Sequence, residues 1–159
     1  MEYIIRDMKE SEYPLLDDFL YEAIFIPEGM SPPPREITQR PELRVYTDGF
    51  GTQSGDIALI AEYDSRPVGA VWVRIMNDYG HIDDDTPSFA IALYKEHRGH
   101  GAGTMLMKTM LKRLSETGCK QASLAVQKAN YAVKLYKKVG FEIIGENEEE
   151  YIMLCHIIH

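Results

Sequence analysis

A glycine-rich segment carries the clearest chemical signal in the sequence: Arg98-Gly99-His100-Gly101-Ala102-Gly103-Thr104. It follows a predicted buried strand at 88–94 and opens a predicted helix that ends near Gly118. The first amide groups of a helix and the helix dipole attract anions, and glycine lets the backbone approach a phosphate. We therefore expect a pyrophosphate to bind here. The spacing fits neither a dinucleotide fingerprint nor a nucleotide P-loop, and the alternative is a tight turn that lets helix and sheet pack closely.

Two sets of residues give this region a family resemblance. Arg98, Gly101 and Gly103 fit the pattern Arg/Gln-x-x-Gly-x-Gly/Ala after a central strand. A second set follows at the expected distance: Asn130, Ala132, Leu135, Tyr136, Gly140 and Phe141. On these residues the sequence resembles the GNAT superfamily of acyl-CoA N-acyltransferases over about residues 56–157. The resemblance implies an α/β fold: one mixed domain at 1–159, with a mostly antiparallel central sheet, splayed middle strands and flanking helices.

The resemblance also implies acetyl-CoA as the acyl donor. The strand backbone at 91–93 would pair with the pantetheine group, and the glycine-rich segment would hold the pyrophosphate. Asn130 would hydrogen-bond the pantetheine, cap its own helix, or do both. The expected cofactor-binding residues are Ile91, Ala92, Leu93, Arg98, Gly99, His100, Gly101, Ala102, Gly103, Thr104, Asn130 and Tyr136.

The implied reaction is the direct attack of a neutral amine on an acyl thioester, followed by loss of the coenzyme A thiolate. The departing thiolate benefits from a proton donor. Tyr136 is the expected general acid. The alternative is that Tyr136 packs at the edge of the core with its hydroxyl group bonded elsewhere.

The general base is harder to assign, because the strand at 88–94 contains none of the carboxylates that some members of the family carry there. Glu62 and Asp84 are our predicted base or relay residues. The other candidates are Glu28, His81 and the neighbours of Asp84 in the triplet 83–85. An ordered water relay is a further alternative.

Other reactive side chains in the sequence predict no site. His97 and His100 flank the glycine-rich segment but have no zinc-ligand spacing, so we expect no metal. Cys119 and Cys155 are too few and too far apart for a disulfide scaffold, and we expect two free thiols.

Hydrophobic periodicity and turn residues predict the elements that must position these groups. The predicted strands are 3–6, 56–63, 68–76, 88–94, 122–126, 141–145 and 151–157. The predicted helices are 11–25, capped by Ser11, then 41–46, 103–118 and 130–139. Five prolines between Pro27 and Pro41 predict a loop with one helical turn, which we expect to shape the acceptor pocket.

Composition limits the function further. The chain has 159 residues, 45% of them hydrophobic, and a formal net charge of −8, which excludes a general nucleic-acid binder. The segment 95–138 holds ten basic and two acidic residues, so the rest of the chain is strongly acidic. This asymmetry predicts two differently charged faces and a cationic acceptor. No membrane helix or signal peptide is expected, and we predict a cytoplasmic monomer or homodimer.

The predicted function is acetyl transfer from acetyl-CoA to a primary amine of a small, cationic acceptor. Two alternatives stay open: a catalytically silent acyl-CoA-binding sensor module, and an acetyltransferase that modifies protein amines. A closed pocket favours the small acceptor, and an exposed groove favours the protein.

Overall fold

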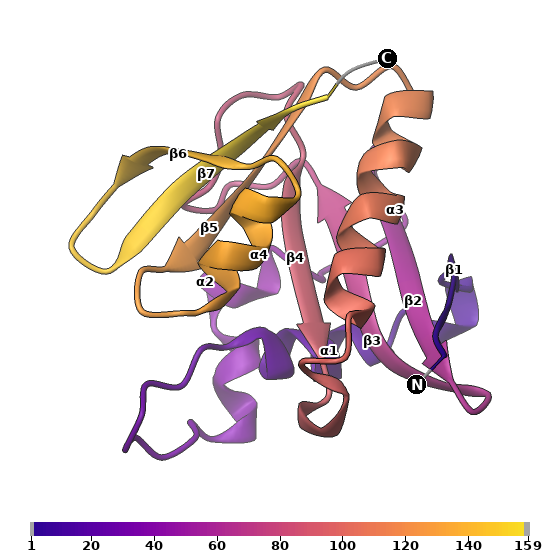
Figure 1. The fold of residues 1–159 in the computed structure, drawn as a ribbon, viewed down its shortest axis with the longest axis vertical. Helices are drawn as coiled ribbons and strands as arrows, with labels where there is room; N and C mark the ends of the chain where they lie inside the picture. The colour runs from indigo at the N-terminus through magenta and orange to yellow at the C-terminus, as the bar shows by residue number, and fades with distance from the viewer. Residues whose placement is uncertain (1, 158–159) are drawn as a thin grey trace.

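The computed structural model describes residues 2–157, which form one mixed α/β domain around a seven-stranded sheet (Figure 1). The strand order is β1-β2-β3-β4-β5-β7-β6, and neighbouring strands are antiparallel except for the parallel pair β4 and β5. The bounds are β1 Ile4–Asp7, β2 Ile57–Tyr63, β3 Arg66–Arg74, β4 Ser88–Leu93, β5 Gln121–Gln127, β6 Glu142–Glu146 and β7 Glu150–His156. The predicted mostly antiparallel sheet is confirmed.

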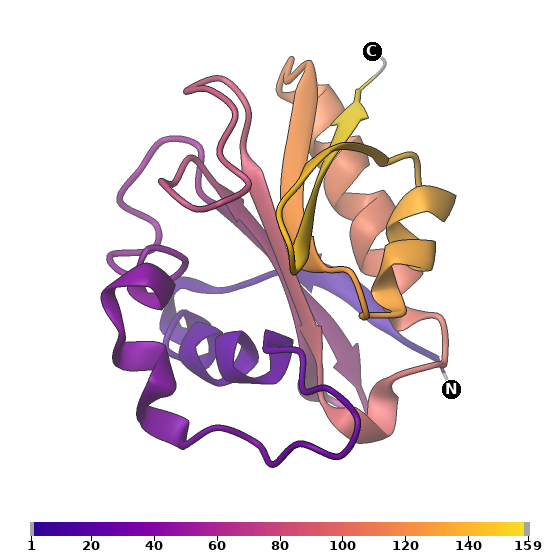
Figure 2. The same cartoon turned by 90° about the vertical axis from the view of Figure 1, so that its left-hand side faces the viewer.

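Helices cover both faces of the sheet (Figure 2). Helices α1 (Leu15–Ala23) and α2 (Pro41–Arg44) lie on one face, and α3 (Ala102–Glu116) and α4 (Ala132–Lys138) lie on the other. Short 3-10 turns complete the order: η1 Glu10–Glu12, η2 Arg35–Gln39 and η3 Lys95–His97. Each face has its own core, because α1 buries an apolar stripe on one side of the sheet and α3 buries one on the other.

The first helix differs from the prediction at its start. Ser11 does not cap it but lies inside η1, and α1 begins at Leu15, directly after Pro14. Proline has no amide hydrogen and is favoured at the start of a helix, so the chain forms a separate 3-10 turn before it. The predicted turn within the proline-rich loop is confirmed as η2, and the predicted helix at Pro41 as the four-residue α2.

The feature that positions the site is the separation of β4 from β5. Within residues 2–157 these strands pair at one position, Ser88 with Ser123, and diverge toward their C-terminal ends. The connector between β3 and β4 packs against the paired end, where the Ser123 hydroxyl donates to the Gly80 carbonyl at 2.7 Å. A Cβ at Gly80 would lie 3.1 Å from the Leu124 carbonyl carbon, so glycine permits this approach. The predicted splayed strands are confirmed, and their divergence forms a fork.

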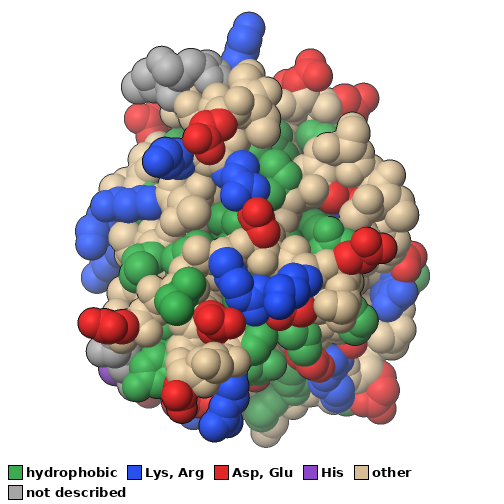
Figure 3. Space-filling view, turned by 90° about the vertical axis from the view of Figure 1, so that its right-hand side faces the viewer, with side chains coloured by type: hydrophobic (Ala, Val, Ile, Leu, Met, Phe, Trp, Pro, Cys, Tyr) green, Lys and Arg blue, Asp and Glu red, His purple; other side chains and the backbone are tan. Residues whose placement is uncertain are grey.

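The charges of the basic segment are partly paired with acids from elsewhere in the chain. Arg113 on α3 lies 2.8 Å from Asp7, and Lys128 lies 2.9 Å from Glu146. Figure 3 shows basic and acidic side chains interspersed over one face of the molecule. The charge asymmetry of the sequence therefore does not give that face a single sign. No helix within residues 2–157 has the length and apolar character needed to span a membrane.

Candidate active site

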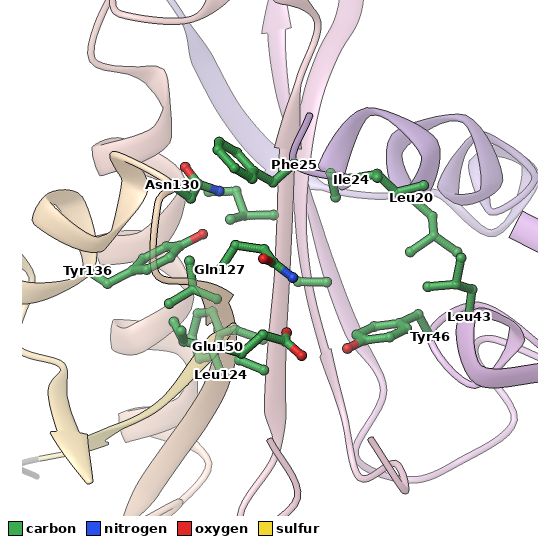
Figure 4. Close-up of a pocket in the computed structure, with 16 residues that line it drawn as sticks. Leu20, Ile24, Phe25, Leu43, Tyr46, Leu124, Gln127, Asn130, Tyr136 and Glu150 are labelled. Carbon is green, nitrogen blue, oxygen red and sulfur yellow. The ribbon is translucent and has the colours of Figure 1, made fainter. Parts of the chain in front are cut away.

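A cavity of about 250 Å³ lies in the fork between β4 and β5 (Figure 4). Apolar side chains from the α1 and α2 face form one wall, and the diverging strands form the floor. Five polar side chains also line it, and two of them are tyrosines. These polar lining residues are Gln127, Asn130, Tyr136, Glu150 and Tyr46.

The glycine-rich segment forms the start of α3, at the open end of the fork. Gly99 and Gly101 have φ angles of +78° and +90°, which L-amino acids with side chains adopt only under strain. The first backbone bond of the helix is from Met105 to the Gly101 carbonyl, so the amides of 102–104 are free to bind an anion. No atom lies within 4 Å of the position of a Cβ at Gly101, so that side of the loop is open.

Other members of the segment have packing roles. Ala102 is fully buried, and a Cβ at Gly103 would lie 3.4 Å from the Leu135 side chain, so these two residues bring α3 close to its neighbours. His100 is exposed and Thr104 is half-buried. The close-packing role is thus observed beside amides that the protein leaves unbonded, and anion binding there stays a prediction.

The Arg98 side chain makes hydrogen bonds within the protein. Its Nε donates to the Leu93 carbonyl at 3.0 Å, and its Nη2 donates to the Glu22 carbonyl at 3.1 Å. The same Nη2 lies 3.4 Å from the Glu22 carboxylate. Arg98 therefore ties the end of β4 to α1, and it shapes the loop by these contacts.

The strand residues expected to pair with pantetheine border the fork. Ile91, Ala92 and Leu93 pair with β3 on one side only, because β4 has already left β5 at this level. Ile91 lines the cavity, and Ala92 is buried in the core on the α1 side. The free strand edge offers backbone donors and acceptors to a ligand with amide groups.

Tyr136 comes from α4 and points into the cavity (Figure 4). The residue is only 8% exposed, and its hydroxyl, which faces the cavity, makes no hydrogen bond with any residue of 2–157. Burial, with a smaller contribution from Tyr131, raises the pKa of Tyr136 to about 12. The hydroxyl is therefore protonated at neutral pH and available as a donor.

One of the two polar side-chain atoms of Asn130 already has a hydrogen-bond partner in the protein. Its Oδ1 accepts a hydrogen bond from the Ala132 amide at 2.9 Å, so it caps the start of α4. The residue also lines the cavity, which leaves its amide nitrogen able to face a ligand. The structure is compatible with both predicted roles at once.

The structure does not bring the predicted base residues to the cavity. Glu62 lies at the β1 side of the sheet, where its carboxylate is 3.2 Å from Arg6 Nε. The Asp84 side chain is 94% exposed in the connector and lies 3.7 Å from His81 Nε2. Glu28 is exposed in the proline-rich loop. Sequence proximity to the central strand was misleading, because the part of the connector that holds residues 81–85 does not line the cavity, whereas Asp78 of the same connector lies beside it.

Three residues that the sequence analysis missed lie at the far end of the cavity from the α3 loop. Glu150 and Tyr46 line it, and Asp78 accepts a hydrogen bond from the Tyr46 hydroxyl at 3.1 Å. Burial raises the pKa of Asp78 and of Glu150. The pairing register of the last strand is the signal that could have found Glu150. Glu150 is the first residue of β7 and pairs with Gln127, the last residue of β5, which places it beside the fork.

Comparisons with known proteins assign these features to a family. Residues 20–141 match the model of the acetyltransferase (GNAT) family. The uncharacterized N-acetyltransferase YjcF of Bacillus subtilis is 30% identical over 141 residues, which cover 87% of this chain and 86% of YjcF. YobR, another uncharacterized N-acetyltransferase of B. subtilis, is 33% identical over 87 residues; the match covers 54% of this chain and only 33% of YobR.

The fold is shared with a solved structure that contains coenzyme A. The PaiA N-acetyltransferase of Thermoplasma acidophilum, solved in complex with coenzyme A, aligns over 98% of this chain and 99% of its own, with a TM-score of 0.70 and 18% identity. Other matches are named for different acceptors, among them a mycothiol acetyltransferase and a ribosomal protein bS18-alanine N-acetyltransferase. Membership of the family therefore does not fix the acceptor.

Proposed function

The chain belongs to the GNAT acetyltransferase family, and from this premise we propose that it transfers the acetyl group of acetyl-CoA to the primary amine of a small, cationic acceptor. The observation that carries the proposal is the hydroxyl of the buried Tyr136 side chain, which has no hydrogen-bond partner among residues 2–157 and points into the fork. The hydroxyl opens onto the cavity instead of being sealed in the core, so a ligand in the fork can accept its hydrogen.

The residues present fit an acyl-CoA. The free amides at the start of α3 would bind the pyrophosphate, and the open edge of β4 at 91–93 would pair with the pantetheine amides. The reactive end of the donor would then lie in the cavity with Tyr136 and Asn130. The chemistry supplied by the bound donor is an activated acetyl group on sulfur.

Tyr136 acts on the leaving sulfur in this proposal. A phenol with a pKa of about 12 transfers its proton to an ordinary thiolate only at a cost, because a thiol has a pKa of about 8.5 in water. The same burial that raises the pKa of Tyr136 also raises that of a thiol placed beside it, so the two values approach one another. Tyr136 therefore stabilises the developing thiolate by a hydrogen bond, and donates the proton as the sulfur leaves.

The shape and charge of the cavity favour a small amine. The cavity is only about 250 Å³, and residues of the α1 and α2 side line the wall opposite β5. Glu150 gives its far end a carboxylate, which attracts a protonated amine. The small volume supports a small acceptor over a protein one in this proposal.

The test is a coenzyme A release assay with acetyl-CoA and a panel of amines. The panel contains small alkyl and aryl amines together with peptides that present an N-terminal amine or a lysine. We expect turnover with small amines and little with peptides. Turnover with peptides alone would replace the small acceptor by a protein one, and tight binding of acetyl-CoA without turnover on any amine would favour the sensor alternative.

A further inference from the structure

The end of the cavity opposite the α3 loop presents hydrogen-bond acceptors. Tyr46 gives its hydroxyl hydrogen to Asp78 Oδ2 at 3.1 Å, so the lone pairs of the phenol oxygen are free. Asp78 Oδ1 in turn accepts from the Ser88 hydroxyl at 3.2 Å, which fixes its orientation. The carboxylate of Glu150 points toward the Tyr46 hydroxyl across the cavity (Figure 4). Such a set of acceptors suits a ligand that is rich in donors.

Glu150 is available for such a ligand. Its carboxylate makes no hydrogen bond or ion pair with the residues that the structure describes, although its backbone amide donates to Asn147 Oδ1 at 2.7 Å. Burial first, and then the charges of Glu149 and Asp78, raise the pKa of Glu150. A carboxylate in this state gains from a nearby cation and is a stronger proton acceptor than one in water.

The second, independent observation is at the other side of the same cavity. Tyr136, which is more than nine-tenths buried, directs its unpartnered hydroxyl into the space that Glu150 faces. The cavity thus has a proton donor at one side and a proton acceptor at the other. This is the arrangement that amine acylation requires, with one group at the leaving sulfur and one at the attacking nitrogen.

The cavity wall on the α1 and α2 side indicates which kind of chemical group carries the amine of the acceptor. Leu20 and Ile24 from the α1 side and Leu43 from α2 are lining residues with aliphatic side chains. A second charged or strongly polar group on the acceptor would lose its hydration there without gaining a partner. An apolar carbon chain would instead bury its surface against these side chains.

We propose that Glu150 binds the ammonium group of the acceptor and takes up its proton, and that the acceptor is a primary amine on a short apolar carbon chain. This inference rests on the proposed function, because it names the acceptor and the base for that reaction. Tyr46 adds a second hydrogen-bond acceptor for the ammonium group, and Asp78 is a positioning residue that holds Tyr46.

The protons balance as follows in this assignment. An ammonium nitrogen loses two protons when it becomes a secondary amide. Glu150 takes the first and releases it to water, which leaves a neutral amine whose lone pair forms the new C–N bond. The second proton leaves the nitrogen after that bond forms, and it balances the proton that the sulfur gains through the Tyr136 hydroxyl when the C–S bond breaks.

The experiment compares Glu150→Gln with Glu148→Gln, an exposed residue of the same turn, using n-butylamine as the probe and acetyl-CoA as the donor. The readout is kcat/KM for the amine between pH 6.5 and 10. The titratable groups that face or influence Glu150 are Asp78, Glu149, Tyr46 and Tyr136, and all four are unchanged in both variants. Coenzyme A affinity is measured for both variants to show that the fold is intact.

We expect Glu150→Gln to lower kcat/KM by about 10²-fold near pH 7 and Glu148→Gln to leave it unchanged. The loss should shrink as the pH approaches about 10.4, the usual pKa of an alkylammonium group, because solution then supplies the neutral amine. A purely structural role would give the same loss at every pH. No loss, or a loss that does not depend on pH, would overturn the assignment of Glu150.

A binding measurement separates this inference from the proposed function. With coenzyme A bound, n-butylammonium should raise the melting temperature of the wild-type protein more than 1-butanol does, and this difference should vanish in Glu150→Gln. If the wild-type protein turns over no amine but shows this difference, the proposed function fails and the ammonium site stands. If amines are turned over and the two variants behave alike, the function stands and the inference fails.

Discussion

Two buried polar regions of this molecule differ in how their hydrogen bonds are used. The first is the pair Arg74 and Asp56, whose side chains are 1% and 0% exposed. Two guanidinium nitrogens lie 3.1 Å from the two Asp56 oxygens, and the third donates to the backbone carbonyls of Val45 and Asp48. Every charged atom of this pair has a partner, so the network closes on itself and ties the segment after α2 to β3.

The second region is the fork, where the Tyr136 hydroxyl and the half-buried Glu150 carboxylate are open to the cavity, although Tyr46 and Asp78 pair with each other at its far end. Tyr136 and Glu150 both face the cavity, and neither side chain has a hydrogen bond to residues 2–157. A closed network stabilises the fold, whereas an open one has a cost that a ligand can offset. The comparison predicts that substitutions in the first region reduce stability, and that substitutions in the second reduce activity.

The largest effect is expected for Tyr136→Phe, which removes the open hydroxyl and keeps the ring. Turnover should fall by about 10²- to 10⁴-fold, because the sulfur loses its proton donor. Stability should not fall, since the hydroxyl has no partner among residues 2–157 to lose. The measurement is kcat together with the melting temperature. Tyr131→Phe, at an exposed tyrosine five residues earlier, is the control; equal turnover in both variants would assign Tyr136 to packing alone.

The second-largest effect is expected in the first region, where a substitution should lower stability and leave activity intact. Arg74→Met leaves the Asp56 carboxylate buried without its cation, which typically costs about 3–5 kcal/mol of unfolding free energy. Turnover per folded molecule should survive at low temperature, because neither residue lines the cavity. Denaturant unfolding measures the loss. Arg44→Met breaks the exposed pair with Asp48 and should cost less than about 1 kcal/mol; similar losses in both variants would contradict the comparison.

A smaller effect concerns the open amides at the start of α3. Coenzyme A at 100 times its dissociation constant should stabilise the protein by about 2.7 kcal/mol. Gly101→Ala should reduce this stabilisation, because a Cβ would project into the open side of the loop and the +90° φ angle would be strained. Gly118, at the opposite end of α3, has a φ of +82° and equally open surroundings, so Gly118→Ala is a matched control. Thermal shifts with and without coenzyme A distinguish binding from strain.

The sequence was sufficient to predict the fold, and it identified the residues that lie on the α3 side of the candidate site, whose role in cofactor binding stays a prediction. Local patterns carry that information: the apolar stripe of α3, the glycines before it, and Tyr136 all lie in short continuous segments. The acceptor side could not be found in this way. Glu150 reaches the cavity only through the pairing of β7 with β5, and Tyr46 and Asp78 only through contacts between the α1 side and the connector. The start of α1 at Leu15 was also missed. The sequence analysis took Ser11 as the N-cap, whereas Pro14 sets the start of the helix.

The smallest effect concerns Glu150. It tests whether the ionised carboxylate of this residue lowers the free energy of unfolding of the ligand-free protein. Burial raises the pKa of Glu150 above its value in the unfolded chain, about 4.3, so the folded protein holds this proton more tightly. The group therefore contributes stability below pH 4, and that contribution is lost as the pH rises through the folded pKa. Glu150→Gln has no such proton to lose, and it should become more stable relative to the wild-type protein as the pH rises from 4 to 7.

Melting temperatures of the two proteins across this range measure the difference, with Glu148→Gln as the control at an exposed site. Added n-butylammonium should reduce the difference at pH 7, because a bound cation favours the ionised carboxylate. Parallel melting curves for all three proteins would mean that Glu150 is hydrated as in water, and the contrast with the Arg74 and Asp56 pair would then rest on Tyr136 alone.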